Sequence, residues 1–105
     1  MSYHEIMAEP MPSSEDFGFE PPENWREDTD ALIAAADAFE HTEGYWLWQI
    51  AVCEWMIRRT QAELDRHVDG KSGYAEWVRR NNPSTIAYEK RLIAKYEGKL
   101  KEVAA

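Results

Sequence analysis

The chain has 105 residues, the size of one small domain, which argues against an enzyme with a cleft between two lobes. Its net charge of −8 argues against a general binder of nucleic acid or of anionic membranes, because both are polyanions. Residues 1–57 hold 13 acids and 1 base, a net charge of −12, whereas residues 58–105 hold 7 acids and 11 bases, a net charge of +4. The chain is therefore an acidic half joined to a mildly basic half.

The cysteine content and the hydropathy predict where such a chain works. Cys53 is the only cysteine, so an intramolecular disulfide is excluded and a reducing cytoplasm is favoured. The first residues lack the basic and apolar regions of a secretory signal. The most apolar run, residues 45–57, is shorter than the roughly 20 residues that a membrane span needs. We expect a cytoplasmic protein, or one in the host cytoplasm or virion if it is phage-encoded.

Residues 1–24 are expected to form an acidic, Pro-rich, irregular tail. Four of the five prolines lie there, and proline removes a backbone donor and fixes φ. Apolar side chains alternate with acids in this tail, a pattern typical of docking segments, and Phe17 and Phe19 are candidate partner-binding residues. Two interpretations stay open: a solvated tail, or a tail that lies along a surface of its own chain or of a partner.

The first helix is predicted over residues 28–41 of a helical domain that covers residues 25–105. Asp28 or Thr29 can cap it, and acids in its first turn suit the positive end of the helix dipole. Gly44 is expected to mark its end. One narrow apolar face has the spacing i, i+3, i+4, i+7, namely Leu32, Ala35, Ala36 and Phe39.

The second helix is predicted over residues 45–68, and it carries a heptad-like apolar seam. The seam residues are spaced 4, 3, 4, 3 and 4 apart, namely Trp46, Ile50, Cys53, Ile57, Thr60 and Leu64. Other apolar side chains cover the remaining faces of its first half. Trp46, Trp48 and Trp55 are more indole surface than two packed helices can hide, so we expect some of these rings to face a partner.

Two further helices are predicted after a turn at residues 69–73. Residues 74–80 form a short helix with Tyr74, Trp77 and Val78 facing inward. Asn82 as N-cap and Pro83 as first helical residue then begin a last helix over 83–103, with a basic outer face. The two long helices are most simply an antiparallel, coiled-coil-like hairpin, so the fold class is all-α.

No pattern of residues predicts an enzyme, a metal, a cofactor or a small-molecule substrate. Gly70-Lys71-Ser72 resembles the end of a phosphate-binding loop, but the earlier glycine and the preceding strand of that motif are missing. The histidines lie far apart, without metal-ligand spacing. Cys53 lies in the apolar seam, where burial makes a thiol inert.

Three functions remain, and the first is favoured. The chain is a small protein–protein interaction or assembly protein that self-associates as a homo-oligomer or docks on a larger protein through its Trp-rich helix. Such chains occur among phage and bacterial accessory proteins. The second is an acidic inhibitor that mimics nucleic acid on a host enzyme. The third is a helix-turn-helix-like DNA binder that uses Arg79 and Arg80, although pairing of these bases with the acidic half of the same or a neighbouring chain is the favoured interpretation.

Overall fold

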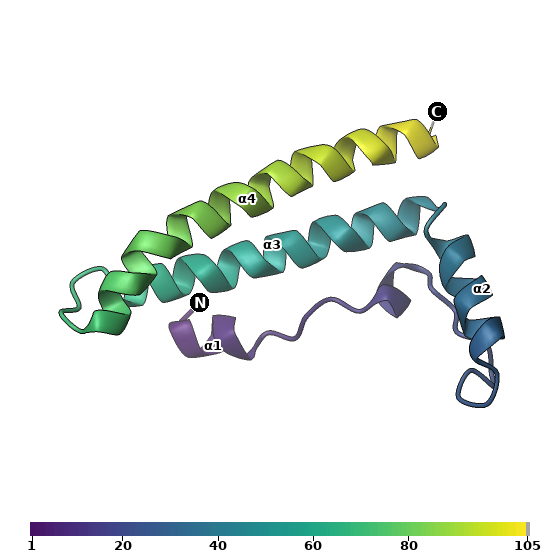
Figure 1. Cartoon of the computed structure of the whole chain (residues 1–105), viewed down its shortest axis with the longest axis horizontal. Helices are drawn as coiled ribbons and strands as arrows, with labels where there is room; N and C mark the ends of the chain where they lie inside the picture. Colours follow the sequence, from purple (N-terminus) through teal and green to yellow (C-terminus); the bar gives the residue numbers. More distant parts are fainter. Residues whose placement is uncertain (105) are drawn as a thin grey trace.

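The computed structural model describes residues 1–104, and this part of the chain is helical with no strand (Figure 1). The predicted all-α class is therefore confirmed. In chain order the elements are α1 (Tyr3–Ala8), the 3-10 helix η1 (Ser14–Phe17), α2 (Thr29–Phe39), α3 (Glu43–Arg66) and α4 (Gly73–Ala104).

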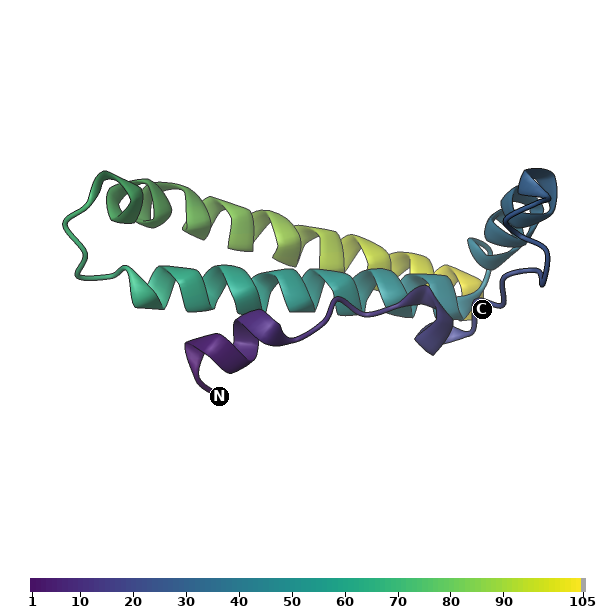
Figure 2. The same ribbon diagram turned by 90° about the horizontal axis from the view of Figure 1, so that it is seen from below.

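The two long helices, α3 and α4, lie side by side and run in opposite directions, as predicted (Figure 2). Their contact is built on small and β-branched side chains, which let the helix backbones approach closely. Cys53 and Ala62 of α3 and Ala75, Val78 and Ile86 of α4 are all buried. The predicted seam of α3 is buried or half-buried throughout, which is the burial expected of a helix face that packs against a neighbour.

The predicted break between a helix at 74–80 and another at 83–103 is wrong, because α4 continues through Pro83. Asn82 does not cap a helix: its side chain is buried, and its amide donates to the Thr60 carbonyl of α3 at 3.1 Å. Proline inside a helix removes one hydrogen bond and bends the axis. Figure 1 shows this bend, since the first turns of α4 run at an angle to the rest of the helix.

The continuous helix also sets which side chains of α4 face inward. Ala75, Val78 and Asn82 are buried, so the inner face has the spacing i, i+3, i+7. Tyr74 and Trp77 were predicted to face inward with Val78, and this prediction is wrong for both. They lie on the outer side, with 54% and 56% of their surface exposed.

Helix α2 leads into the N-terminal end of α3 and projects away from the hairpin (Figure 1). Its predicted inner face is buried or half-buried along its length, and Phe39 is the most buried member. Gly44 does not end this helix. It lies in the first turn of α3, which begins after the N-cap Thr42.

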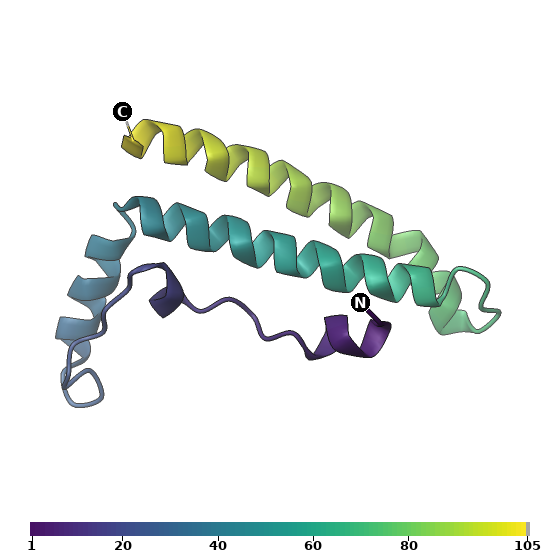
Figure 3. The same cartoon turned by 180° about the vertical axis from the view of Figure 1, so that it is seen from behind.

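The N-terminal segment was predicted to be irregular throughout. This prediction is wrong in part, because the segment contains α1 and η1. Ser2 and Glu5 form a capping box that closes the first turn of α1. Gly18 ends η1 with a φ of 100°, a left-handed conformation that favours glycine. Figure 3 shows this segment running along α3 on the side away from α4.

Candidate interaction surface

We call residues 1–19 the N-terminal strap, because they contact α3 along most of its length. Two tryptophans of α3 bind the strap backbone. The Trp55 indole N–H donates to the Glu9 carbonyl at 2.8 Å, and the Trp48 indole N–H donates to the Pro12 carbonyl at 2.9 Å. Buried indole N–H groups need such a partner. The predicted tail is therefore a docked segment, and it lies on its own chain.

Two arginines of α3 extend this attachment with charged donors. Arg58 makes a two-pronged ion pair with the Glu9 carboxylate, at 3.0 and 3.2 Å. The Arg59 guanidinium donates to the Met7 carbonyl at 2.7 Å and also lies 4.6 Å from the centre of the Trp55 ring. Hydrogen bonds from charged donors are stronger than neutral ones, so these arginines fix the register of the strap on α3.

Glu63 of α3 joins the strap to the far end of the hairpin. Tyr3 donates to one of its carboxylate oxygens at 2.6 Å and Tyr74 donates to the other at 2.9 Å, with His67 at 3.0 Å. The Tyr3 hydrogen bond is the main cause that lowers the pKa of Glu63, with smaller contributions from Tyr74 and His67. The same bond raises the pKa of Tyr3. One carboxylate therefore couples α1, α3 and α4.

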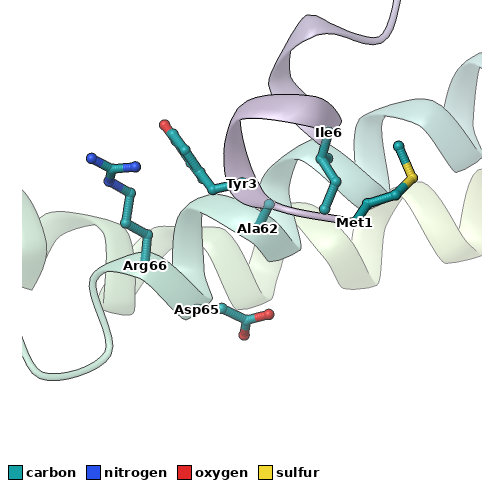
Figure 4. A pocket seen from close by; sticks show the side chains of 6 residues that line it. All are labelled: Met1, Tyr3, Ile6, Ala62, Asp65 and Arg66. Carbon is teal, nitrogen blue, oxygen red and sulfur yellow. The ribbon is translucent and has the colours of Figure 1, made fainter.

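Beside α1 the strap leaves an open hollow of about 330 Å³, which Figure 4 shows at close range. The Arg66 guanidinium lies 4.2 Å from the centre of the Tyr3 ring. Ile6 and Ala62 supply the apolar part of the lining, with Met1 and Asp65 beyond them. The hollow is an open groove at the contact between α1 and α3.

At the other end of the strap, the aromatic side chains pack within the chain. The Phe19 ring lies 5.3 Å from that of Phe39, which in turn lies 6.3 Å from the ring of Trp48. Gly44 permits the backbone of Phe17 to lie close to α3, because a Cβ at position 44 would overlap the carbonyl oxygen of Phe17. Both predicted partner-binding residues of the tail, Phe17 and Phe19, are thus half-buried against their own chain.

The three α3 tryptophans predicted to bind a partner are all half-buried. Trp48 and Trp55 hold the strap, as described above. The Trp46 ring packs on the Tyr96 ring of α4 at 5.7 Å and on the Tyr45 ring at 4.8 Å. That these residues bind a partner stays a prediction, but a large part of each ring already serves the fold.

At the end of the hairpin where the turn joins α3 to α4, which we call the closed end, two aromatic rings are exposed to solvent. Trp77 stacks on Tyr74 with the ring centres 6.2 Å apart and the planes 15° apart. Tyr74 is held from behind, because its ring meets the His67 ring edge-on at 5.1 Å and its hydroxyl is bound to Glu63. Arg80 is exposed one turn further along α4. We call Tyr74, Trp77 and Arg80 the closed-end patch.

Arg79 and Arg80 were predicted together as candidate binding residues, but their surroundings in the structure differ. The Arg79 guanidinium donates to the carbonyls of His67 and Gly70, both at 2.7 Å, so it caps the end of α3 and holds the turn. Arg80 points to solvent. Residues 77–82 lie inside α4, without the helix start that was predicted at Asn82 and Pro83.

Cys53, which the sequence places in the apolar seam of α3, is buried. Burial is the main cause that raises the pKa of Cys53 to about 12, and the neighbouring Glu89 carboxyl adds to it. Among residues 1–104, no three His, Cys, Asp or Glu side chains lie close enough together to hold a metal ion. Within the same range, no helix is both long and apolar enough to cross a membrane.

Some residues that matter at this surface were missed, and their signals differ. Ser2 and Glu5 have the spacing of a capping box, which would have predicted α1. Glu9 carries no local signal, because its partner Arg58 lies 49 residues away in the chain; Glu63 has the i,i+4 spacing with His67, but its bond to Tyr3 spans 60 residues.

Taken together, the elements define a small helical hairpin with a docked N-terminal strap and one projecting acidic helix. Comparison of the chain with family models, with curated proteins and with solved structures gives no match to any of them.

Proposed function

We propose that this chain is a small non-enzymatic protein that binds another protein through the closed-end patch. The observation that carries the proposal is the pair of stacked rings, Tyr74 and Trp77, which are more than half exposed at the end of the hairpin. Trp, Tyr and Arg are the residue types that dominate the energy of protein interfaces. The patch contains one of each.

The way in which the rings are held supports the proposal. Tyr74 is fixed by its bond to Glu63 and by the His67 ring, and Trp77 stacks on it. Rings that are held before binding lose little freedom when a partner covers them, which favours affinity. The heptad-like spacing of the α3 seam also supports coiled-coil packing, which would keep the patch at the end of a rigid rod.

The chemistry of the patch indicates the kind of partner. The two rings suit a hydrophobic pocket, and Arg80 suits an acidic group at the rim of that pocket. Arg80 forms no ion pair within residues 1–104, so its guanidinium is free to pair with such a group.

Affinity capture from cells that express the tagged chain tests the proposal, with Trp77→Ser as the test variant. The matched control is Trp25→Ser, which removes the exposed indole that lies before α2. We expect a partner that the wild type and the control retain and that Trp77→Ser loses by at least about tenfold, the change that removal of one interface hot spot causes. Titration of the purified pair then measures the change directly. Equal retention by Trp77→Ser would refute the closed-end patch as the docking surface.

A further inference from the structure

Helix α2 presents one row of exposed side chains that nothing in the chain covers. The row has the spacing 3, 4 and 3, which places its members on one side of a helix, and consists of Asp30, Ile33 and Asp37 of α2 and its C-cap residue Glu40. Ile33 is 53% exposed and lies between acids. A large aliphatic side chain among acids on a projecting helix is suited to a surface that is apolar at one point and basic beside it.

Helix α4 presents a row of the complementary kind along its middle. Its members, spaced 4, 3 and 4 apart, are Ser84, Tyr88, Arg91 and Lys95, and all are exposed. Tyr88 is 53% exposed, and the Arg91 guanidinium lies 6.0 Å from the centre of its ring. This row offers an aromatic ring next to two bases.

The two rows match in length and in order. Each covers about 15 to 17 Å of helix at 1.5 Å per residue. If the helices run in parallel, Ile33 meets Tyr88, and the two acids that follow it meet the two bases that follow Tyr88. The wider charges agree, since residues 20–43 hold 8 acids and 1 base, whereas residues 84–101 hold 2 acids and 5 bases. Within residues 1–104 none of the charged members of either row forms an ion pair.

We propose that the α2 row of one copy packs in parallel along the α4 row of a second copy. Ile33 then lies on Tyr88, Asp37 pairs with Arg91, and Glu40 pairs with Lys95. A second copy is the occupant because the rows complement each other, but α2 projects away from the hairpin within one molecule (Figure 1). The contact uses two different surfaces, so each copy keeps one free row and assembly proceeds head to tail. This proposal does not depend on the closed-end patch.

Two double variants test the contact by sedimentation velocity on the purified full chain. Ile33→Ser with Asp37→Lys blocks the α2 row, and Tyr88→Ser with Arg91→Glu blocks the α4 row. All four side chains are exposed, so the fold should survive, and circular dichroism checks this. The wild type should grow in mass with concentration, and growth should weaken at about 1 M salt, where charges are screened within about 3 Å.

Each variant alone should remain a single chain, with self-association weakened about tenfold or more. A mixture of the two should form particles of two chains and no larger, because one complementary pair of rows remains intact. The Trp77→Ser variant should assemble like the wild type, which separates this proposal from the proposed function. A wild type that stays monomeric at about 1 mM and low salt, or blocked variants that assemble normally, would overturn the proposal.

Discussion

The attachment of the strap to α3 can be tested with two glycine-to-alanine substitutions that differ only in their surroundings. At Gly44 an added Cβ would overlap the carbonyl oxygen of Phe17, whereas at Gly98 it would meet nothing within 4 Å. Both positions lie inside helices, so alanine lowers the helical cost in both variants. The comparison therefore isolates the contact between α3 and the strap.

The magnitudes follow from this geometry. Gly98→Ala should raise the free energy of unfolding by about 0.5–1 kcal/mol, the usual gain of alanine over glycine in a helix interior. Gly44→Ala should lower it by about 1–2 kcal/mol, since overpacking against a backbone atom costs about 1–3 kcal/mol and the helical gain offsets only part of this. The two changes thus have opposite signs, and the two variants should differ by about 1.5–3 kcal/mol in the free energy of unfolding.

Urea denaturation followed by tryptophan fluorescence measures both values, and hydrogen exchange shows where the change arises. In Gly44→Ala the amides of the strap should lose protection while those in the middle of α3 and α4 keep it. In Gly98→Ala the protection of the strap should not change. If both variants gain stability and the strap stays protected in both, then the strap does not rest on α3 at Gly44.

Three further predictions concern two titratable groups and one glycine with a positive φ. The pKa of Glu63 is lowered in the folded chain, so its bonds to Tyr3 and Tyr74 stabilise the fold above about pH 4.3 and are lost as the pH falls through the folded pKa. The NMR signals of the Tyr3 ring should therefore shift as the pH falls through the folded pKa of Glu63, and Glu63→Gln should abolish this shift. Since burial raises the pKa of Cys53 to about 12, iodoacetamide at pH 8 should label the native chain at least about tenfold more slowly than the urea-unfolded chain, and equal rates would contradict its burial. Gly18→Ala should lower the free energy of unfolding by about 1 kcal/mol because of the φ of 100°, and an unchanged urea midpoint would show that η1 relaxes without cost.

The sequence carries enough local information to predict the hairpin. A run of apolar residues with heptad-like spacing predicts a helix over residues 45–68, and the structure places α3 two residues earlier, at Glu43–Arg66. The inner face of α2 was also predictable, because its period is that of a single amphipathic helix. These features depend on residues three or four positions apart, and periodicity reports such neighbours directly.

Features that depend on distant residues were not predictable in this way. The Asn82-Pro83 pair is a strong local start signal, but the hydrogen bond from Asn82 to the Thr60 carbonyl on α3 favours a continuous helix. Because α4 is continuous, its register turns Trp77 outward, opposite to the prediction for a short separate helix. The place of the strap depends on tryptophans and arginines of α3 that are far away in the chain, and no pattern within residues 1–19 reports them.

The separations between the strap and its partners have a consequence for the order in which the chain folds. The hydrogen bonds of the strap join residues 36 to 60 positions apart, from Pro12 with Trp48 to Tyr3 with Glu63. Arg79, by contrast, ties the turn to His67 across 12 positions. Closing a long loop costs more entropy than closing a short one, so we expect the hairpin to form first. The strap, which leaves the ribosome before the hairpin, is then the later of the two to find its place, and until it does the indole N–H groups of Trp48 and Trp55 face water.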